Sequence, residues 1–288
     1  MSRSTGTPHP PADRAAAPVA GPAIRRQGRL RLTMLDPAKQ VGSQTGQREE
    51  DGVAREKAGP WIGLCIVVFY PLSHLLGRWR FEGLEHIPQT GPVLVACNHL
   101  SYLDPLYTGI FVHRRGRIPR FLAKEDLWRI PVVRRVMAGA GQIPVRRGGA
   151  GASESLRYAE EALASGKTVL IYPEGTVTRD PDRWPMTAHT GIARLALRTG
   201  VPVVPVVHWG THLIYDHYAR RFRPLPRTEV IVRAGPPVDL SEFRHRPVDG
   251  PVLREVTARV MDRIRDLLAE VRQEPAPPGT AHPMRSGE

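Results

Sequence analysis

The 288-residue chain contains few of the residues on which several classes of protein depend. It has only two cysteines, Cys65 and Cys97, and each lies within an apolar run. Their surroundings predict that both cysteines are small core residues and form no disulfide, which favours a reducing compartment. The sequence has neither a P-loop nor a Gly-x-Gly-x-x-Gly fingerprint, and its histidines match no zinc-ligand spacing. We therefore expect no bound cofactor and no metal.

Acidic residues are scarce relative to basic ones. The 28 Asp and Glu stand against 41 Lys and Arg, which gives a formal net charge of +13. This excess predicts an anionic partner, either nucleic acid or an acidic lipid surface. Only 6% of the residues are aromatic, and there is no RNA-binding aromatic signature, zinc-finger spacing or basic heptad region. We therefore expect a phospholipid surface as partner and no nucleic acid.

The sequence also lacks the run of about 20 apolar residues that a bilayer-spanning helix requires. Its most apolar segment, residues 61–76, is shorter and contains Pro71. Tryptophans bracket this segment, and Arg78 and Arg80 follow it. That arrangement is typical of a helix lying in one leaflet. We predict a membrane-associating helix over residues 58–80, with a buried helix or a full span as alternatives.

The remaining composition divides the chain into an arm, a domain and a tail. Residues 1–57 are rich in Pro, Ala, Gly and Arg without periodicity, which predicts a disordered basic arm. Residues 81–272 alternate predicted strands and helices, which indicates one α/β domain with a mostly parallel sheet flanked by helices. The last helix, residues 251–271, is amphipathic, and we expect it to dock on the domain. Residues 273–288 predict a flexible tail.

The individual elements of the domain follow from apolar runs and periodicity. Strands are predicted over residues 93–97, 121–123, 168–172 and 203–207, with an edge strand over 229–234; helices are predicted from about residue 104 and over 153–164, 191–198 and 251–271.

A polar pair follows the strand predicted over residues 93–97. Asn98 and His99 come directly after it, and Asp104 stands five residues beyond His99. If Asp104 accepts a hydrogen bond from one ring N–H of His99, the tautomer is set and the other nitrogen can take a proton. The pattern therefore favours a general base, and a capping or merely polar pair is the alternative.

Three later segments have a related character. Residues 141–147 form a short apolar run that ends in two arginines, residues 171–176 form a strand that ends in an acidic turn, and residues 201–206 form a proline-containing strand. In this order and at these intervals, the four segments together resemble the glycerolipid acyltransferase family, whose type member acylates 1-acylglycerol-3-phosphate. The resemblance covers roughly residues 60–238.

The resemblance implies a glycerol-3-phosphate acyltransferase-like fold and a site for acyl transfer. His99 would be the general base and Asp104 would orient it. The donor would be acyl-CoA or acyl-ACP (acyl carrier protein), the acceptor a lysophospholipid, and the product phosphatidic acid for phospholipid biosynthesis. The enzyme would be peripheral or monotopic on the cytoplasmic face of the cell membrane.

The resemblance also maps the family's substrate-binding positions onto this chain. They fall on Lys124, Arg146, Arg147, Glu174, Gly175 and Thr176. The family's usual next residue is an arginine that contacts phosphate, whereas this chain has Val177. Arg179 is the predicted substitute, because period-two geometry would return it to the face of Val177. Otherwise, the acceptor headgroup differs from glycerol-3-phosphate.

Alternatives remain at the level of residue and of function. Ser101 is a candidate nucleophile, but the chain lacks a Gly-x-Ser-x-Gly elbow, so we assign Ser101 and Asn98 supporting roles. The acceptor is either lysophosphatidate or another lysophospholipid or glycolipid. A non-catalytic lipid- or nucleic-acid-binding protein is the alternative from another class, and the intact His99 and Asp104 argue against it.

Overall fold

The computed structural model describes residues 56, 58–146 and 149–277. The predicted arm, residues 1–57, lies outside the described residues except for Glu56, and the predicted tail does so from residue 278 onward. Arg147 also lies outside them. The predicted disorder of the arm and the predicted flexibility of the tail therefore stay predictions.

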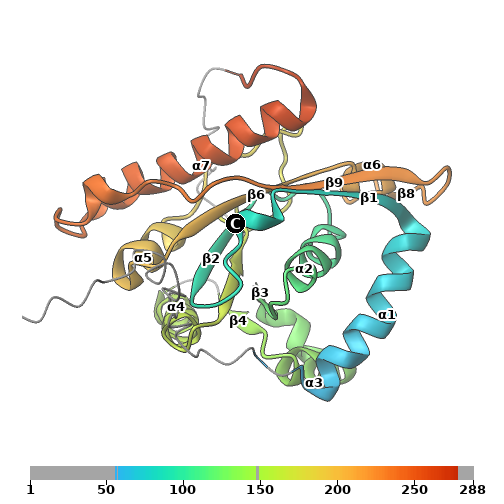
Figure 1. Cartoon of the computed structure of the whole chain (residues 1–288), viewed down its shortest axis with the longest axis horizontal. Helices are drawn as coiled ribbons and strands as arrows, with labels where there is room; N and C mark the ends of the chain where they lie inside the picture. The colour runs from blue at the N-terminus through green and yellow to red at the C-terminus, as the bar shows by residue number, and fades with distance from the viewer. Residues whose placement is uncertain (1–55, 57, 147–148, 278–288) are drawn as a thin grey trace, which may run out of the picture. The chain divides into compact units, whose positions relative to one another are not determined.

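The described residues form a seven-stranded sheet in the order β1-β9-β6-β2-β5-β3-β4 (Figure 1). The strands are β1 (Gly77–Glu82), β9 (Thr228–Ala234), β6 (Val203–Trp209), β2 (Val93–Cys97), β5 (Thr168–Ile171), β3 (Pro119–Lys124) and β4 (Ile143–Val145). Every neighbouring pair is parallel except β6 and β9, which are antiparallel. The predicted mostly parallel sheet is thus confirmed.

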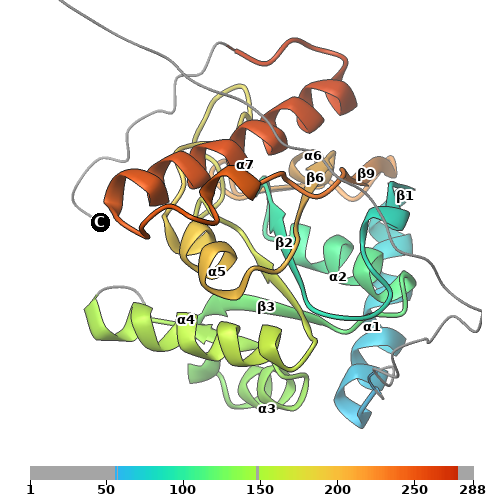
Figure 2. The same cartoon turned by 60° about the vertical axis from the view of Figure 1, so that its left-hand side comes forward.

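Helices cover both faces of this sheet (Figures 1 and 2). On one face lies α2 (Asp104–Arg114), with α1 (Pro60–Leu76) beside it and α3 (Pro131–Gly139) against α1. The other face carries α4 (Gly149–Ala164), α5 (Gly191–Thr199) and α7 (Gly250–Arg272). Because both faces are covered, all five residues of β2 are buried, which explains its continuous apolar sequence.

The remaining elements are short. They are η1 (Leu84–His86), η2 (Glu125–Arg129), α6 (Thr211–Ile214), β7 (Tyr215–Asp216), β8 (Arg221–Phe222) and η3 (Ser241–Phe243). β7 and β8 pair as an antiparallel two-stranded sheet.

The C-terminal helix α7 docks on the domain, as its amphipathic pattern predicts. The apolar residues of its stripe are all buried: Val252, Val256, Val260, Ile264, Leu267 and Val271. The Asp249 side chain caps the helix by accepting a hydrogen bond from the backbone N–H of Val252 at 2.9 Å. The apolar face therefore packs against the sheet and α5 rather than a lipid surface.

The strand predicted at the sheet edge, residues 229–234, is not an edge strand. It lies within β9, which is hydrogen-bonded to β6 on one side and to β1 on the other. The prediction failed because it included no strand over residues 77–82. Those residues form the actual edge, and they pair in register from Gly77 with Thr228 to Glu82 with Arg233.

The helix predicted over residues 58–80 is shorter than expected, since α1 ends at Leu76. Gly77 takes an extended conformation, and a Cβ atom there would lie 2.8 Å from the hydroxyl of Tyr107. The close packing at this glycine marks the change from helix to strand. Arg78 and Arg80 consequently lie on β1 rather than at the end of a helix.

The predicted apolar helix presents an unusual surface. Its buried side chains are Ile62, Ser73 and Leu76, whereas six large apolar side chains are exposed: Leu64, Val67, Val68, Phe69, Leu72 and Leu75. No helix in the described part of the chain combines the length and apolarity needed to cross a bilayer. Helix α1, at 17 residues, is about 26 Å long.

Candidate active site

The candidate site lies where the central strand β2 ends. Because β2, β5, β3 and β4 are parallel, the loops that follow them lie together at the carboxyl ends of these strands. Asn98, the first residue after β2, is fully buried. Its side chain donates to the carbonyl of His208 at 3.2 Å and accepts from the His208 N–H at 2.8 Å. This pair of bonds joins β2 to β6 directly before His99.

The predicted pair of His99 and Asp104 forms a direct hydrogen bond. The distance from His99 Nδ1 to Asp104 Oδ2 is 2.8 Å. The same Oδ2 accepts the backbone N–H groups of Leu100 at 2.6 Å and Ser101 at 2.8 Å. Oδ1 accepts the hydroxyl of Thr211, so both oxygens of the fully buried carboxylate are held.

The protonation of this pair follows from the surroundings of Asp104. Burial would raise the pKa of this carboxyl, but the His99 hydrogen bond, the nearby imidazoles and the Thr211 hydroxyl hold it below its usual range. Asp104 also stands at the N-terminus of α2, where the helix dipole favours a negative charge. Because an ionised carboxylate can only accept hydrogen bonds, Nδ1 of His99 carries the proton. Nε2 is therefore the nitrogen that can act as a base.

The ring of His99 is held flat against Tyr172, the residue that follows β5. The two ring centroids are 4.3 Å apart and the planes differ by 27°. Tyr172 is in turn hydrogen-bonded to Thr108 of α2 at 3.1 Å. The His99 side chain remains 12% exposed, and no described residue hydrogen-bonds its Nε2. The arrangement thus leaves one ring nitrogen accessible for proton transfer.

Glu174 supports the loop that carries His99. Its Oε1 accepts the backbone N–H of His99 at 3.0 Å, and its Oε2 accepts that of Met186 at 2.9 Å. Burial raises the pKa of this carboxyl to about 8, against the effect of these two hydrogen bonds. The resemblance places Glu174 among the substrate-binding residues, and that role stays a prediction. In this structure each carboxylate oxygen accepts one backbone N–H, so Glu174 connects the two loops.

Ser101 is also part of this support. Its side chain is fully buried, and its hydroxyl donates to the carbonyl of Tyr215 at 2.8 Å while accepting the N–H of Leu103 at 3.3 Å. A buried hydroxyl in this environment is poorly placed to attack a thioester. The geometry therefore favours the supporting role over the nucleophilic alternative.

The predicted acidic turn contains one position that requires glycine. Gly175 has φ +70°, and a Cβ atom there would lie 2.9 Å from Cδ2 of His189. A residue with a side chain at this position would strain the left-handed backbone and crowd the ring of His189, so glycine is favoured. Thr176 follows as a partly exposed residue.

A match to a family model coincides with this geometry. The model described as "Acyltransferase" matches residues 78–209, which include His99, Asp104 and Glu174. Residues 78–209 are therefore similar in sequence to the acyltransferase family.

Individual relatives share part of their length with this chain. It is 31% identical over 153 residues to "1-acyl-sn-glycerol-3-phosphate acyltransferase BAT2, chloroplastic" of Brassica napus, covering 52% of this chain and 41% of the relative. Identity to 1-acyl-sn-glycerol-3-phosphate acyltransferase alpha of Homo sapiens is 29%, covering 70% of this chain and 67% of the relative. The chain thus spans about two fifths of the plant relative it matches.

The crystal structure of the 1-acyl-sn-glycerophosphate acyltransferase PlsC from Thermotoga maritima has a similar fold. The TM-score is 0.52 at 28% sequence identity, and the match covers 72% of this chain and 79% of PlsC. The layered α/β architecture of this domain is therefore similar to that of PlsC.

The predicted cations Lys124 and Arg146 lie at the carboxyl ends of the same parallel strands, farther from β2. Lys124 ends β3 and pairs with Asp126 at 2.8 Å, with 60% of its side chain exposed. Arg146 follows β4 and pairs with Glu125 at 2.7 Å and with Glu154 at 3.2 Å. Neither residue contacts His99 in this structure, and their roles in binding stay predictions.

The prediction that Arg179 shares a face with Val177, and so stands in for the family's arginine, is wrong in its geometry. Val177 is fully buried, whereas Arg179 is exposed. The segment over residues 176–180 is not a strand, so its side chains do not alternate between two faces. Instead, the carbonyl of Val177 accepts the hydroxyl of Tyr218 at 2.7 Å.

Sequence reasoning missed several residues that build the dyad's surroundings. Thr211, Tyr172 and His208 contact the pair or its loop only through tertiary structure, and Thr108 of α2 is hydrogen-bonded to Tyr172. The one available signal was position, since Tyr172 follows β5 directly and His208 lies in the last part of β6.

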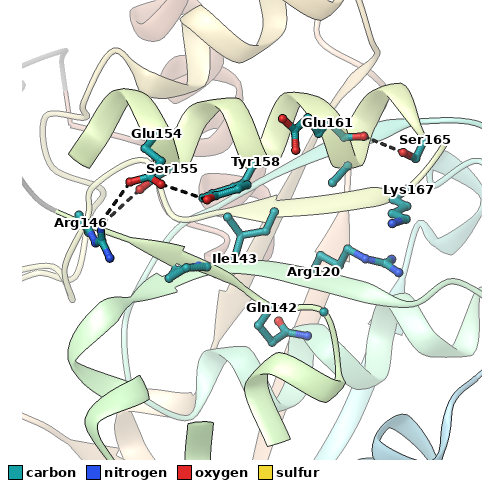
Figure 3. Close-up of a pocket in the computed structure, with 13 residues that line it drawn as sticks. Arg120, Gln142, Ile143, Arg146, Glu154, Ser155, Tyr158, Glu161, Ser165 and Lys167 are labelled. Carbon is teal, nitrogen blue, oxygen red and sulfur yellow. Dashed lines mark hydrogen bonds and ion pairs between the residues drawn. The ribbon is translucent and has the colours of Figure 1, made fainter. Parts of the chain in front are cut away.

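A cavity of about 540 Å³ lies elsewhere in the domain, between β4 and α4. Figure 3 shows Arg120 and Lys167 at one end and Arg146, Glu154 and Tyr158 at the other. Neither His99 nor Asp104 lines it. Two of its polar side chains, Arg146 and Tyr158, pair with Glu154.

Proposed function

We propose that this protein transfers a fatty acyl group from acyl-CoA or acyl-ACP to the free hydroxyl of 1-acylglycerol-3-phosphate, which gives phosphatidic acid. The single observation that carries the proposal is the hydrogen bond between Nδ1 of His99 and the buried carboxylate of Asp104. The relatives named for this acceptor support the choice of substrate.

The dyad can perform the proton transfers that this reaction needs. Nε2 of His99 takes the hydroxyl proton as the acceptor oxygen attacks the thioester carbonyl. Asp104 stabilises the resulting imidazolium, which its buried negative charge favours. The tetrahedral intermediate then collapses, the carbon–sulfur bond breaks, and the departing thiolate takes the proton from His99. Ester and thiol are the products, and the dyad returns to its starting state.

Lys124 is the cation best placed to hold the acceptor's phosphate. It ends β3, which lies two strands from β2 in the sheet. Adjacent strands are about 4.8 Å apart, so the strand ends are separated by about 10 Å, a span that a lysine side chain and a glycerol phosphate bridge together. Arg146, one strand farther, would contribute charge at longer range. Arg147, which matches the family's arginine, is a further candidate.

The nearest alternative keeps the reaction and changes the acceptor to another lysophospholipid or a glycolipid. The buried Val177 motivates it, because this side chain offers no charge to a phosphate. A panel of acceptors with different headgroups decides between them, and a preference for an uncharged headgroup would contradict the lysophosphatidate assignment.

Membrane association is the second part of the proposal. The exposed apolar side chains of α1 would lie in one leaflet, on the cytoplasmic face, where the lysolipid remains in the bilayer and the soluble donor arrives from water. Flotation with phospholipid vesicles tests this placement. Protein that stays at the bottom of the gradient at low ionic strength would contradict it.

The function is tested by following free thiol release from palmitoyl-CoA with lysophosphatidate and vesicles. We expect release by the unaltered protein that depends on the acceptor, and none above background by His99→Ala. His245→Ala is the matched control, because His245 is exposed and lies outside the site. No thiol release with any acceptor or with either donor type would favour a non-catalytic lipid-binding role.

A further inference from the structure

The hairpin formed by β7 and β8 and the segment that follows it have an unusual composition. Residues 217–227 contain four arginines at positions 220, 221, 223 and 227 and no Asp or Glu. Large apolar side chains lie among them, and Tyr218, Phe222 and Leu225 are 46%, 56% and 74% exposed. The segment therefore presents positive charge and apolar surface together.

This segment adjoins the C-terminal end of α1. Arg227 donates to the carbonyl of Gly77 at 3.1 Å, and the next residue, Thr228, pairs with Gly77 in the sheet. Leu75 of α1, two residues before Gly77, is 67% exposed. Figure 1 shows β8 beyond the end of α1 that leads into β1. The apolar surface of α1 thus continues toward the hairpin.

The hairpin is also attached to the loops that carry the site. Ser101 donates to the carbonyl of Tyr215, and the hydroxyl of Tyr102 lies 3.2 Å from Nε2 of His217. The hydroxyl of Tyr218 donates to Val177, which belongs to the loop after β5. The segment between these anchors and β9 is exposed, apart from a partly buried Pro224.

We propose that residues 217–227 form a second membrane-binding element that seats on anionic phospholipid beside α1. The arginines contact lipid phosphates, and the side chains of Phe222 and Leu225 enter the interface between headgroups and acyl chains. The attachments to Ser101 and Tyr102 then hold the loop that carries His99 at the depth of the lipid headgroups. The inference rests on the proposed function for this last step, whereas lipid binding by the hairpin stands apart from it.

A membrane suits this surface better than an acidic protein such as a carrier protein. An acidic partner would account for the arginines but leave Leu225 exposed in water. The apolar stripe of α1 lies next to the hairpin and calls for the same kind of apolar environment. One lipid surface covers both features.

The charge is tested with the double variant Arg221→Glu/Arg223→Glu in the full-length protein. Binding is measured by co-sedimentation with phosphatidylcholine vesicles that contain or lack phosphatidylglycerol. Each arginine near an anionic surface contributes about a fivefold increase in affinity, so we expect at least about tenfold weaker binding to the anionic vesicles. Arg244→Glu/Arg254→Glu is the control, since both arginines are exposed near η3 and α7 and the charge change is identical. Equal losses in the two variants would overturn the proposal.

The apolar contribution is tested separately with Phe222→Ser/Leu225→Ser, and Val248→Ser is the control because Val248 is 51% exposed elsewhere. We expect weaker binding even to vesicles without phosphatidylglycerol, with an unchanged melting temperature showing that the fold is intact. Unchanged binding in both hairpin variants would overturn the proposal.

Activity separates this inference from the proposed function. For Arg221→Glu/Arg223→Glu, the ratio of activity on vesicle-borne lysophosphatidate to activity on a water-soluble short-chain analogue should fall about tenfold. Loss of activity with acyl-ACP but not with acyl-CoA, at unchanged vesicle binding, would reassign the surface to a carrier protein. If the unaltered protein transfers no acyl group, the proposed function fails while the binding results still decide the role of the hairpin.

Discussion

The backbone N–H of His99 donates a 3.0 Å hydrogen bond to Oε1 of Glu174, which joins the loop after β2 to the loop after β5. The carbonyl of His99 makes a second connection, since it accepts the N–H of Thr178 at 2.8 Å. The candidate base is therefore held on both sides of its backbone by one neighbouring loop. Its ring is held independently by Asp104 and Tyr172.

Replacing His99 with Ala should abolish the proposed acyl transfer. General-base assistance is worth about 10²–10⁴-fold, and no other described side chain shares the position of Nε2. Initial rates of thiol release measure the loss. The melting temperature should change little, because the ring is partly exposed; retention of more than about a tenth of the activity would contradict the assigned role.

Replacing Asp104 with Asn should lower kcat by on the order of 10³-fold, because an amide in place of the carboxylate favours the wrong tautomer of His99. The variant should also be less stable, since Oδ2 accepts three N–H groups in a fully buried site. Thr211→Val is the comparison. It removes one hydrogen bond to Oδ1 and leaves those to Oδ2, so we expect only about a fivefold decrease.

Replacing Glu174 with Gln should lower kcat by about tenfold with little change in KM, because a side-chain amide offers one acceptor oxygen where two backbone N–H groups now bind. Steady-state kinetics separate the two constants. A change confined to KM would indicate that Glu174 contacts the acceptor directly.

The same carboxyl should make stability depend on pH. Burial raises its pKa from 4.5 to about 8, so between these values the folded protein keeps a proton that the unfolded chain has released. Glu174 then contributes most stability below about pH 4.5, and this contribution is lost as the pH rises through about 8. Urea denaturation across this range measures the free energy of unfolding. Glu174→Gln should show a smaller decrease with rising pH, and an identical decrease would contradict the assignment.

Replacing Arg272 with Met should destabilise the docking of α7. The guanidinium of Arg272 lies between Trp184 and Trp209, 4.2 Å and 4.5 Å from their ring centroids, and donates to the carbonyl of Asp182 at 2.7 Å. The loss of these contacts should lower the free energy of unfolding by about 2 kcal/mol. Arg263→Met, on the exposed side of the same helix, should have little effect. Equal effects in thermal unfolding would show that the tryptophan contacts contribute nothing.

Local patterns were sufficient where the interacting residues are close in sequence. The link between His99 and Asp104 was predictable because five residues span the turn from β2 into α2. The burial of α7 was predictable because its apolar stripe keeps helical periodicity along most of the 23-residue helix. Strand β1 was missed, because its alternating Trp79 and Phe81 directly follow a strongly apolar helix and pair with a strand about 150 residues later.

The sequence by itself determined the central strands, the helices over residues 153–164, 191–198 and 251–271, the mostly parallel sheet and the dyad, because each depends on residue periodicity or on contacts within a few residues. Only the tertiary structure decided which groups surround the dyad. Thr211 reaches Asp104 across 107 residues, and Glu174 reaches His99 across 75 residues. Only the tertiary structure, too, showed that Val177 is buried while Arg179 is exposed. Such contacts depend on how parallel strands bring distant loops together at their carboxyl ends, and no local spacing encodes that arrangement.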